Sequence, residues 1–264
     1  MPSTYAHFRL GNEVMERLDG DARRACESHR DLYGIGLHGP DILFYYDALH
    51  RNPVSQIGFD MHERPGREFF GPARERLGDS GDAGRAYLYG YICHFALDSE
   101  AHPYIEDYIH ARGVAHTAIE GEFDRMLLER DGRNPAKSYL AEHIHTDESG
   151  YGTISLFYPD VTAEQVSRTL EDMRKYNRLL VAPGRIKRAL IERTLRKTGN
   201  YDDMIGLVIK NEPDPRCADS DRELDSIYKG AVDLSVELIG VLERYLDGEI
   251  DELPARFDRT FSYT

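Results

Sequence analysis

The stretch from Cys93 to Asp107, CHFALDSEAHPYIED, holds three side chains of types that bind metal ions. His94 and Asp98 are four residues apart, and His102 follows Asp98 by four more. Residues four apart share one face of a helix, so an imidazole and a carboxylate can reach the same cation. Apolar residues surround His94, and a carboxylate buried there needs a cation or another partner. A hydrogen-bonded histidine–aspartate pair in the core is the alternative interpretation.

A second pair of the same kind follows further along the chain. His116 and Glu120 are also four residues apart, on the next predicted helix. A single pair is a weak signal, since such pairs occur on ordinary helix surfaces, but two on consecutive helices indicate more. Imidazole nitrogens and carboxylate oxygens suit zinc or another transition metal.

Three further ligand types lie upstream, each next to apolar residues. Asp41 in GPDILFYYD follows a Gly-Pro turn at the start of an apolar helix, where it could equally be an N-cap. His62 lies in IGFDMHERP, and His7 lies in TYAHFRLGNEVM. Each has a structural explanation of its own. Together they favour a metal centre formed by His7, Asp41, His62, His94, Asp98, His102, His116 and Glu120.

Helices are expected to position these ligands. Residues 81–113 predict a helix to about Ser99, a kink near Pro103 and a continuation. Residues 115–132 and 221–248 predict amphipathic helices that end in glycine, and Thr162 with Gln165 predicts a capping box. Residues 151–159, YGTISLFYP, are the best strand candidate. The prediction is a single compact all-α domain over residues 1–264, with roughly eight to ten helices.

Composition narrows the class of protein. The net charge of −14 argues against binding to nucleic-acid backbones or anionic lipid through overall charge. Residues 185–197, RIKRALIERTLRK, predict a basic amphipathic helix whose charges form a solvated face. No apolar run reaches the roughly 18 residues of a membrane span, and the N-terminus does not resemble a signal peptide. Three cysteines without a CxxC pair argue against disulfides, so we expect a cytoplasmic protein.

The ordered ligand set resembles the bacterial zinc-dependent phospholipase C family, whose fold is shared by the fungal single-strand nucleases. The motifs YAHF, GPDI, MHE, HFALD, AHPYI and HTAIE match the family pattern in chain order, over about the first 125 residues. The resemblance implies an all-α domain with two or three zinc ions. One ion would be held by Asp41, His62, His94 and Asp98, a second by His102, His116 and Glu120, and a third by His7 and Asp98, with Asp98 bridging two ions.

The chain departs from the family pattern at three points. Family members begin with a tryptophan that binds the third ion through its amine and carbonyl, whereas this chain has no tryptophan. His38 or His145 could complete the third site instead. The spacing from Asp98 to His102 is shorter than the family usually has, and His50 competes with His62 for its place. We favour His62 because its neighbours are apolar.

The resemblance implies hydrolysis of a small-molecule or lipid phosphoester, with metal ions that activate water and Asp41 orienting or deprotonating it. Tyr45, Tyr46 and Phe70 are candidates for binding a choline-type cation, although core packing is the commoner role of such residues. Acidic composition argues against a nucleic-acid substrate. Two alternatives are a non-catalytic metal-binding or helical interaction protein with a degenerate cluster, and a helical protein whose histidines are structural. The oligomeric state stays open.

Overall fold

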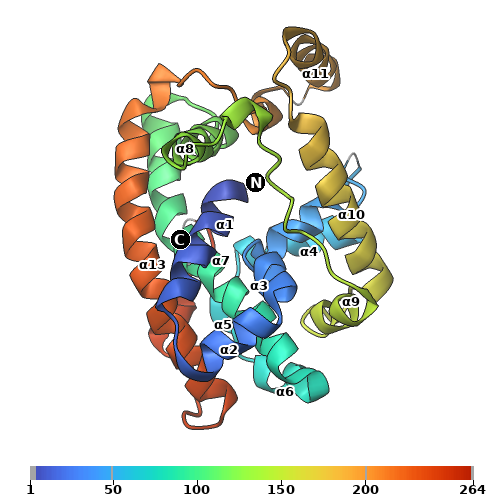
Figure 1. Ribbon diagram of the computed structural model, residues 1–264, viewed down its shortest axis with the longest axis vertical. Helices are drawn as coiled ribbons and strands as arrows, with labels where there is room; N and C mark the ends of the chain where they lie inside the picture. Colours follow the sequence, from blue (N-terminus) through green and yellow to red (C-terminus); the bar gives the residue numbers. More distant parts are fainter. Residues whose placement is uncertain (1–3, 49, 200, 263–264) are drawn as a thin grey trace.

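The computed structural model describes residues 4–48, 50–199 and 201–262 (Figure 1). Helices make up the regular structure of these residues, and the only pairing of strand type is an isolated bridge between Pro65 and Thr260. The α-helices are α1 (Thr4–Arg17), α2 (Gly20–Ser28), α3 (Arg30–Gly36), α4 (Pro53–His62), α5 (Gly66–Phe70), α6 (Ala73–Leu77), α7 (Gly81–Arg112), α8 (His116–Arg130), α9 (Glu148–Ser155), α10 (Ala163–Leu180), α11 (Arg185–Thr198), α12 (Tyr201–Met204) and α13 (Ala218–Leu246). Short 3₁₀ helices lie at Gly39–Tyr45 (η1), Gly78–Ser80, Pro135–Lys137, Ile205–Leu207, Pro215–Cys217 and Ala255–Asp258.

The predicted all-α class is confirmed, and the predicted strand is wrong. Residues 151–155 belong to α9, and the segment after them is a turn. Asp147 caps this helix by accepting a hydrogen bond from the N–H of Gly150 at 3.1 Å. A short apolar run does not distinguish a strand from a buried helix, and α9 packs on α10 and α7 instead of on another strand.

Helix α7 is the centre of the molecule, and α3, α2 and α13 pack against it (Figure 1). Its residues from Ala86 to Ser99 are buried on every side, as expected of a helix that is apolar all round. Glycines bring α3 and α7 into backbone contact, because a Cβ atom on Gly36 would lie 2.2 Å from the carbonyl oxygen of Tyr87. The polar side chains of this stretch, His94, Asp98 and Ser99, therefore lie inside the protein.

The predicted kink near Pro103 does not interrupt α7, which continues to Arg112. Proline has no N–H, so the carbonyl of Ser99, four residues earlier, loses its helical hydrogen bond. Arg259 replaces that bond, donating from Nη2 to the Ser99 carbonyl at 2.6 Å. The C-terminal segment thereby satisfies the group that Pro103 leaves free, and Asp98 and His102 stay one turn apart on a continuous helix.

Other predicted features agree with the structure. Thr162 and Gln165 form the expected capping box at the start of α10, and the long C-terminal helix is α13.

The chain is divided into more and shorter helices than expected. One reason is that Gly71 and Pro72 separate α5 from α6. Among the described residues, no helix is long and apolar enough to cross a membrane.

Candidate metal centre

Four segments converge on the middle of α7, which itself supplies His94, Asp98 and His102. α1, η1, α4 and α8 add the other predicted ligands. Gly113, in the left-handed conformation at φ 64°, ends α7 and turns the chain, so that α8 begins at His116. The rings of His102 and His116 then lie 5.2 Å apart.

The inner group consists of Asp41, His62, His94 and Asp98. The Nε2 atom of His94 lies 3.1 Å from Oδ2 of Asp98 and 3.9 Å from Oδ2 of Asp41, and His62 Nε2 lies 2.9 Å from the other oxygen of Asp41. One atom from each residue lies within 4.8 Å of the others. Zinc bonds of about 2 Å place the ligand atoms of a tetrahedral site about 3.3 Å apart, so small movements of these four side chains would allow them to bind one ion.

The outer group consists of His102, His116 and Glu120, which also lie within 4.8 Å of one another through their ligand atoms. Glu120 Oε1 lies 3.1 Å from Nε2 of His116 and 3.7 Å from Nε2 of His102. Asp98 Oδ2 is 3.9 Å from the same nitrogen of His102. Asp98 therefore lies between the two groups.

The location of His7 depends on a buried carboxylate that sequence reasoning missed. Asp124 on α8 accepts hydrogen bonds from the backbone N–H groups of Tyr5 and Ala6, at 3.0 and 2.8 Å, and so caps the first turn of α1. Burial raises the pKa of Asp124 to about 7 despite these bonds. With α1 held in this way, His7 Nε2 lies 3.1 Å from Oδ1 of Asp98. Within the described residues, no third potential ligand lies close enough to His7 and Asp98 to form with them a group like the inner and outer ones.

The polar atoms of both groups fit a bound cation. Among the described residues, several buried side-chain atoms make no hydrogen bond: both oxygens of Asp41, Nε2 of His94, Oδ2 of Asp98, Nε2 of His116 and Oε2 of Glu120. Leaving such atoms unsatisfied costs about 1–3 kcal/mol each. These atoms face one another in both groups, and the nitrogen and oxygen donor set suits zinc.

The carboxylates of the two groups are ionised. Burial favours the neutral acid, but the imidazoles of His94, His102 and His7 hold the pKa of Asp98 well below its usual range. The imidazoles of His94 and His62 likewise lower the pKa of Asp41 against the effect of burial. Anionic oxygens, the form that binds metal, are therefore present near neutral pH.

Backbone carbonyls orient two of the imidazoles. The Nδ1 atom of His62 lies 2.8 Å from the carbonyl oxygen of Gly58, and Nδ1 of His102 contacts the carbonyl oxygen of Phe261. When Nδ1 carries the hydrogen, Nε2 is the free atom, and Nε2 is the atom that faces the carboxylates. Gly39, at φ 48°, allows close approach to His94, since a Cβ there would lie 2.2 Å from its ring.

The alternative histidines, His38, His50 and His145, are not members of either group. The side chain of His50 is 77% exposed and faces Asp47, whereas His62 lies with Asp41, His94 and Asp98. The Nε2 atom of His38 lies 2.7 Å from Nε2 of His143, and His145 is exposed. His38 therefore pairs with a histidine that the sequence did not single out.

A comparison with protein families decides the relationship. The family model described as zinc-dependent phospholipase C matches residues 6–170, which include all the residues of both groups. The chain belongs to the zinc-dependent phospholipase C family. The match extends past the first 125 residues, to which the sequence motifs are confined, and takes in α9 and the first part of α10. None of the curated proteins and none of the solved structures compared with the chain matches it.

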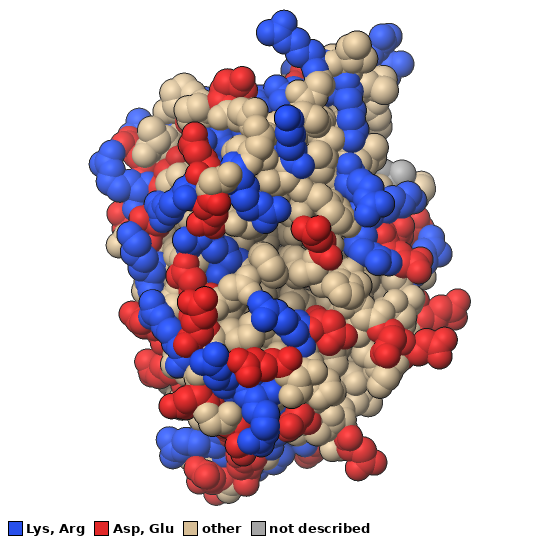
Figure 2. Space-filling view, in the orientation of Figure 1, with Lys and Arg blue, Asp and Glu red and all other residues tan. Residues whose placement is uncertain are grey.

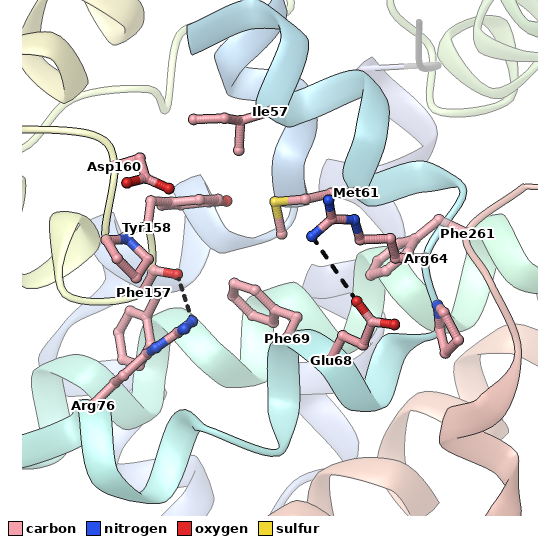
Figure 3. A pocket seen from close by; sticks show the side chains of 12 residues that line it. Ile57, Met61, Arg64, Glu68, Phe69, Arg76, Phe157, Tyr158, Asp160 and Phe261 are labelled. Atoms are coloured by element: carbon pink, nitrogen blue, oxygen red, sulfur yellow. Dashed lines mark hydrogen bonds and ion pairs between the residues drawn. The ribbon is translucent and has the colours of Figure 1, made fainter. Parts of the chain in front are cut away.

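Membership of the zinc-dependent phospholipase C family and the two groups together fit a metal-dependent hydrolase. A pocket with a volume of about 200 Å³ lies between α4, α5 and the segment after α9 (Figure 3), and Met61, the residue before His62, is part of its lining. Met61, Phe69 and Phe261 line it, and Arg64 and Glu68 stand on one side of it. Phe261 belongs to both places, since its ring lies 5.9 Å from the rings of His62 and His94.

The C-terminal segment is the part of this site that no sequence motif revealed. It lies outside the residues matched by the family model, yet Phe261 is buried and Ser262 donates from its N–H to the His62 carbonyl at 3.1 Å. The choline-binding candidates have other neighbours. Phe70 is fully buried against Phe257, the Tyr45 hydroxyl accepts a hydrogen bond from Asn177, and the ring of Tyr46 lies 5.2 Å from the guanidinium of Arg168.

Proposed function

We propose that the protein is a zinc-dependent phosphoester hydrolase of the phospholipase C type, with one ion in the inner group and one in the outer group. The observation that carries this proposal is the set of unpartnered, buried and converging donor atoms in both groups. Bound ions of this kind lower the pKa of water and stabilise the charge that develops on a phosphoryl group.

The protein's own residues supply position and proton transfer. Asp98 orients both groups, because it lies within 3.9 Å of the ring nitrogens of His94 and His102. Asp41 is the candidate base: neither of its oxygens makes a hydrogen bond, so one can accept a proton while the other binds a cation. We propose His7 as a further ligand next to Asp98, which would bridge two ions if a third is bound.

We propose a small-molecule or lipid phosphoester as the substrate. The family supports the lipid, and the apolar side chains of the pocket beside His62 can take an apolar part of the substrate. Cys26, Cys93 and Cys217 are all free and buried, which supports a reducing compartment such as the cytoplasm.

The test is hydrolysis of soluble chromogenic substrates by protein reconstituted with zinc. We expect bis(p-nitrophenyl) phosphate and p-nitrophenyl phosphorylcholine to be hydrolysed, with activity lost in a chelator and restored by zinc. Release of the headgroup from phosphatidylcholine vesicles then distinguishes a phospholipase from a phosphodiesterase that acts only on small molecules. Zinc bound without hydrolysis of any of these substrates would contradict the proposal and favour the non-catalytic metal-binding protein.

A further inference from the structure

Helix α11 differs from every other long helix in how little of it is buried. Leu195 is its one buried residue among those described, and its packing partner is the short α12. In Figure 1 the helix projects at one end of the molecule, away from α7 and α13. It also lies outside the residues matched by the family model and carries none of the candidate ligands.

An exposed stripe runs along α11 through Ile186, Leu190, Arg193 and Lys197. These residues are spaced by four, three and four, so they share one face. Ile186 is 88% exposed and Leu190 is 64% exposed. Among the described residues, neither Arg193 nor Lys197 has a hydrogen-bond or ion-pair partner. The sequence predicted a solvated basic face here, but the apolar side chains on the same face are exposed too.

The exposed apolar residues and the bases gather at the same end of the protein. Leu179, at the end of α10, is 54% exposed and lies close to α11 in sequence. α11 has six bases and one acid in a chain whose net charge is −14. Figure 2 shows Lys and Arg side chains clustered around this end of the molecule.

We infer that α11 docks on the surface of an anionic lipid bilayer, with Ile186 and Leu190 inserted among the lipids and Arg193 and Lys197 on their headgroups. A membrane surface uses both parts of the stripe, because apolar burial and attraction to anionic lipid add to each other in interfacial helices. A nucleic acid would use the bases and leave the two large apolar side chains in water.

The acidic character of the rest of the chain does not prevent this docking. Electrostatic repulsion is screened over about 8–10 Å at physiological salt. Because α11 projects from one end of the molecule (Figure 1), it can lie on a bilayer while the body of the protein extends away from the membrane. The inference goes beyond the proposed function, since it rests on the surface of α11 and not on the metal centre.

The experiment is co-sedimentation of the full-length protein with two kinds of vesicle, phosphatidylcholine alone and phosphatidylcholine with phosphatidylglycerol. The variants are Ile186→Ser/Leu190→Ser and Arg193→Glu/Lys197→Glu. Matched controls elsewhere on the surface are Leu156→Ser, at a residue 43% exposed, and Arg222→Glu on α13. Released headgroup is measured in the supernatant, and a soluble phosphodiester is assayed in parallel.

We expect binding to the anionic vesicles, a loss of about tenfold or more in affinity for each double variant, and no change in the controls. Thermal stability and hydrolysis of the soluble substrate should stay at the wild-type level. No vesicle binding, or binding that either double variant retains in full, would overturn the inference. The inference would also be overturned if the wild-type protein bound a single-stranded oligonucleotide, or self-associated on size exclusion, and the stripe variants abolished that property in place of vesicle binding. Vesicle binding without hydrolysis of the soluble substrate would reject the proposed function alone.

Discussion

The inner and outer groups have similar ligand types but different surroundings. The inner group has four protein ligands, and its His94 and Asp41 are almost fully buried. The outer group has three, and the side chain of His116 is 33% exposed. Structural zinc sites use four protein ligands, whereas catalytic sites use three and keep one position open. Because its side chains are more deeply buried, we expect the inner group to contribute more to the stability of the fold than the outer group does.

The largest expected effect comes from the residue that joins the two groups. Asp98→Asn removes the negative charge shared by His7, His94 and His102, so we expect both ions to be lost and hydrolysis to fall by at least about 10³-fold. Asp107→Asn, at an exposed position on the same helix, is the matched control. Retention of both metal equivalents by the Asp98 variant would contradict its place between the groups.

The next prediction separates the groups by stability. His94→Ala removes a fully buried ring and an inner ligand, and we expect it to lower the free energy of unfolding by about 2–4 kcal/mol. His116→Ala, at a partly exposed outer position, should lower it by less than about 1 kcal/mol while still abolishing most hydrolysis. Denaturant titrations in the presence of zinc measure both. Equal destabilisation by the two variants would remove the distinction drawn above.

Arg259 connects the C-terminal segment with the outer group. Arg259→Ala leaves the Ser99 carbonyl unpaired one turn before Pro103, so we expect a loss of about 1–3 kcal/mol in stability. Because His102 lies in this turn and contacts the Phe261 carbonyl, zinc affinity of the outer group should fall by about 10–100-fold. Arg222→Ala, at an exposed arginine, is the control. An unchanged outer affinity would show that the C-terminal segment does not position His102.

Proton release should also distinguish the groups. Burial opposes protonation of His102, but Asp98 and Glu120 raise its pKa to about 9, so the metal-free protein holds a proton there at pH 7. His94 is different, because burial lowers its pKa and leaves the ring neutral. Zinc must displace the proton on His102, and outer affinity should therefore fall as pH is lowered. Calorimetry in buffers of different ionisation enthalpy measures this release. Release that His102→Ala leaves unchanged would contradict the assignment.

The smallest effect is expected at His50, the rejected candidate. His50→Ala should change neither zinc content nor hydrolysis, because its side chain is exposed and faces Asp47. His62→Ala, measured beside it, should lose the inner ion. The reverse result would mean that the choice between the two histidines is wrong.

The helical class and the members of both groups were predictable from sequence, because four-residue spacing on a helix is local information. Two features that the sequence missed join residues that lie far apart in the chain. Asp124 caps α1 across more than one hundred residues, and Arg259 completes a hydrogen bond of α7 from the other end of the protein. The exposure of Ile186 was equally hidden, since an amphipathic pattern predicts an apolar face but does not show whether another element covers it.

The most direct test of the account is the metal content of the purified protein, measured by plasma mass spectrometry after zinc reconstitution. We expect at least two equivalents of zinc in the wild-type protein, one fewer in His116→Ala and none in Asp98→Asn. If the wild-type protein bound no zinc under these conditions, or if His116→Ala kept all of it, two separate metal sites would be ruled out. The histidines and carboxylates around α7 would then be a hydrogen-bonded core.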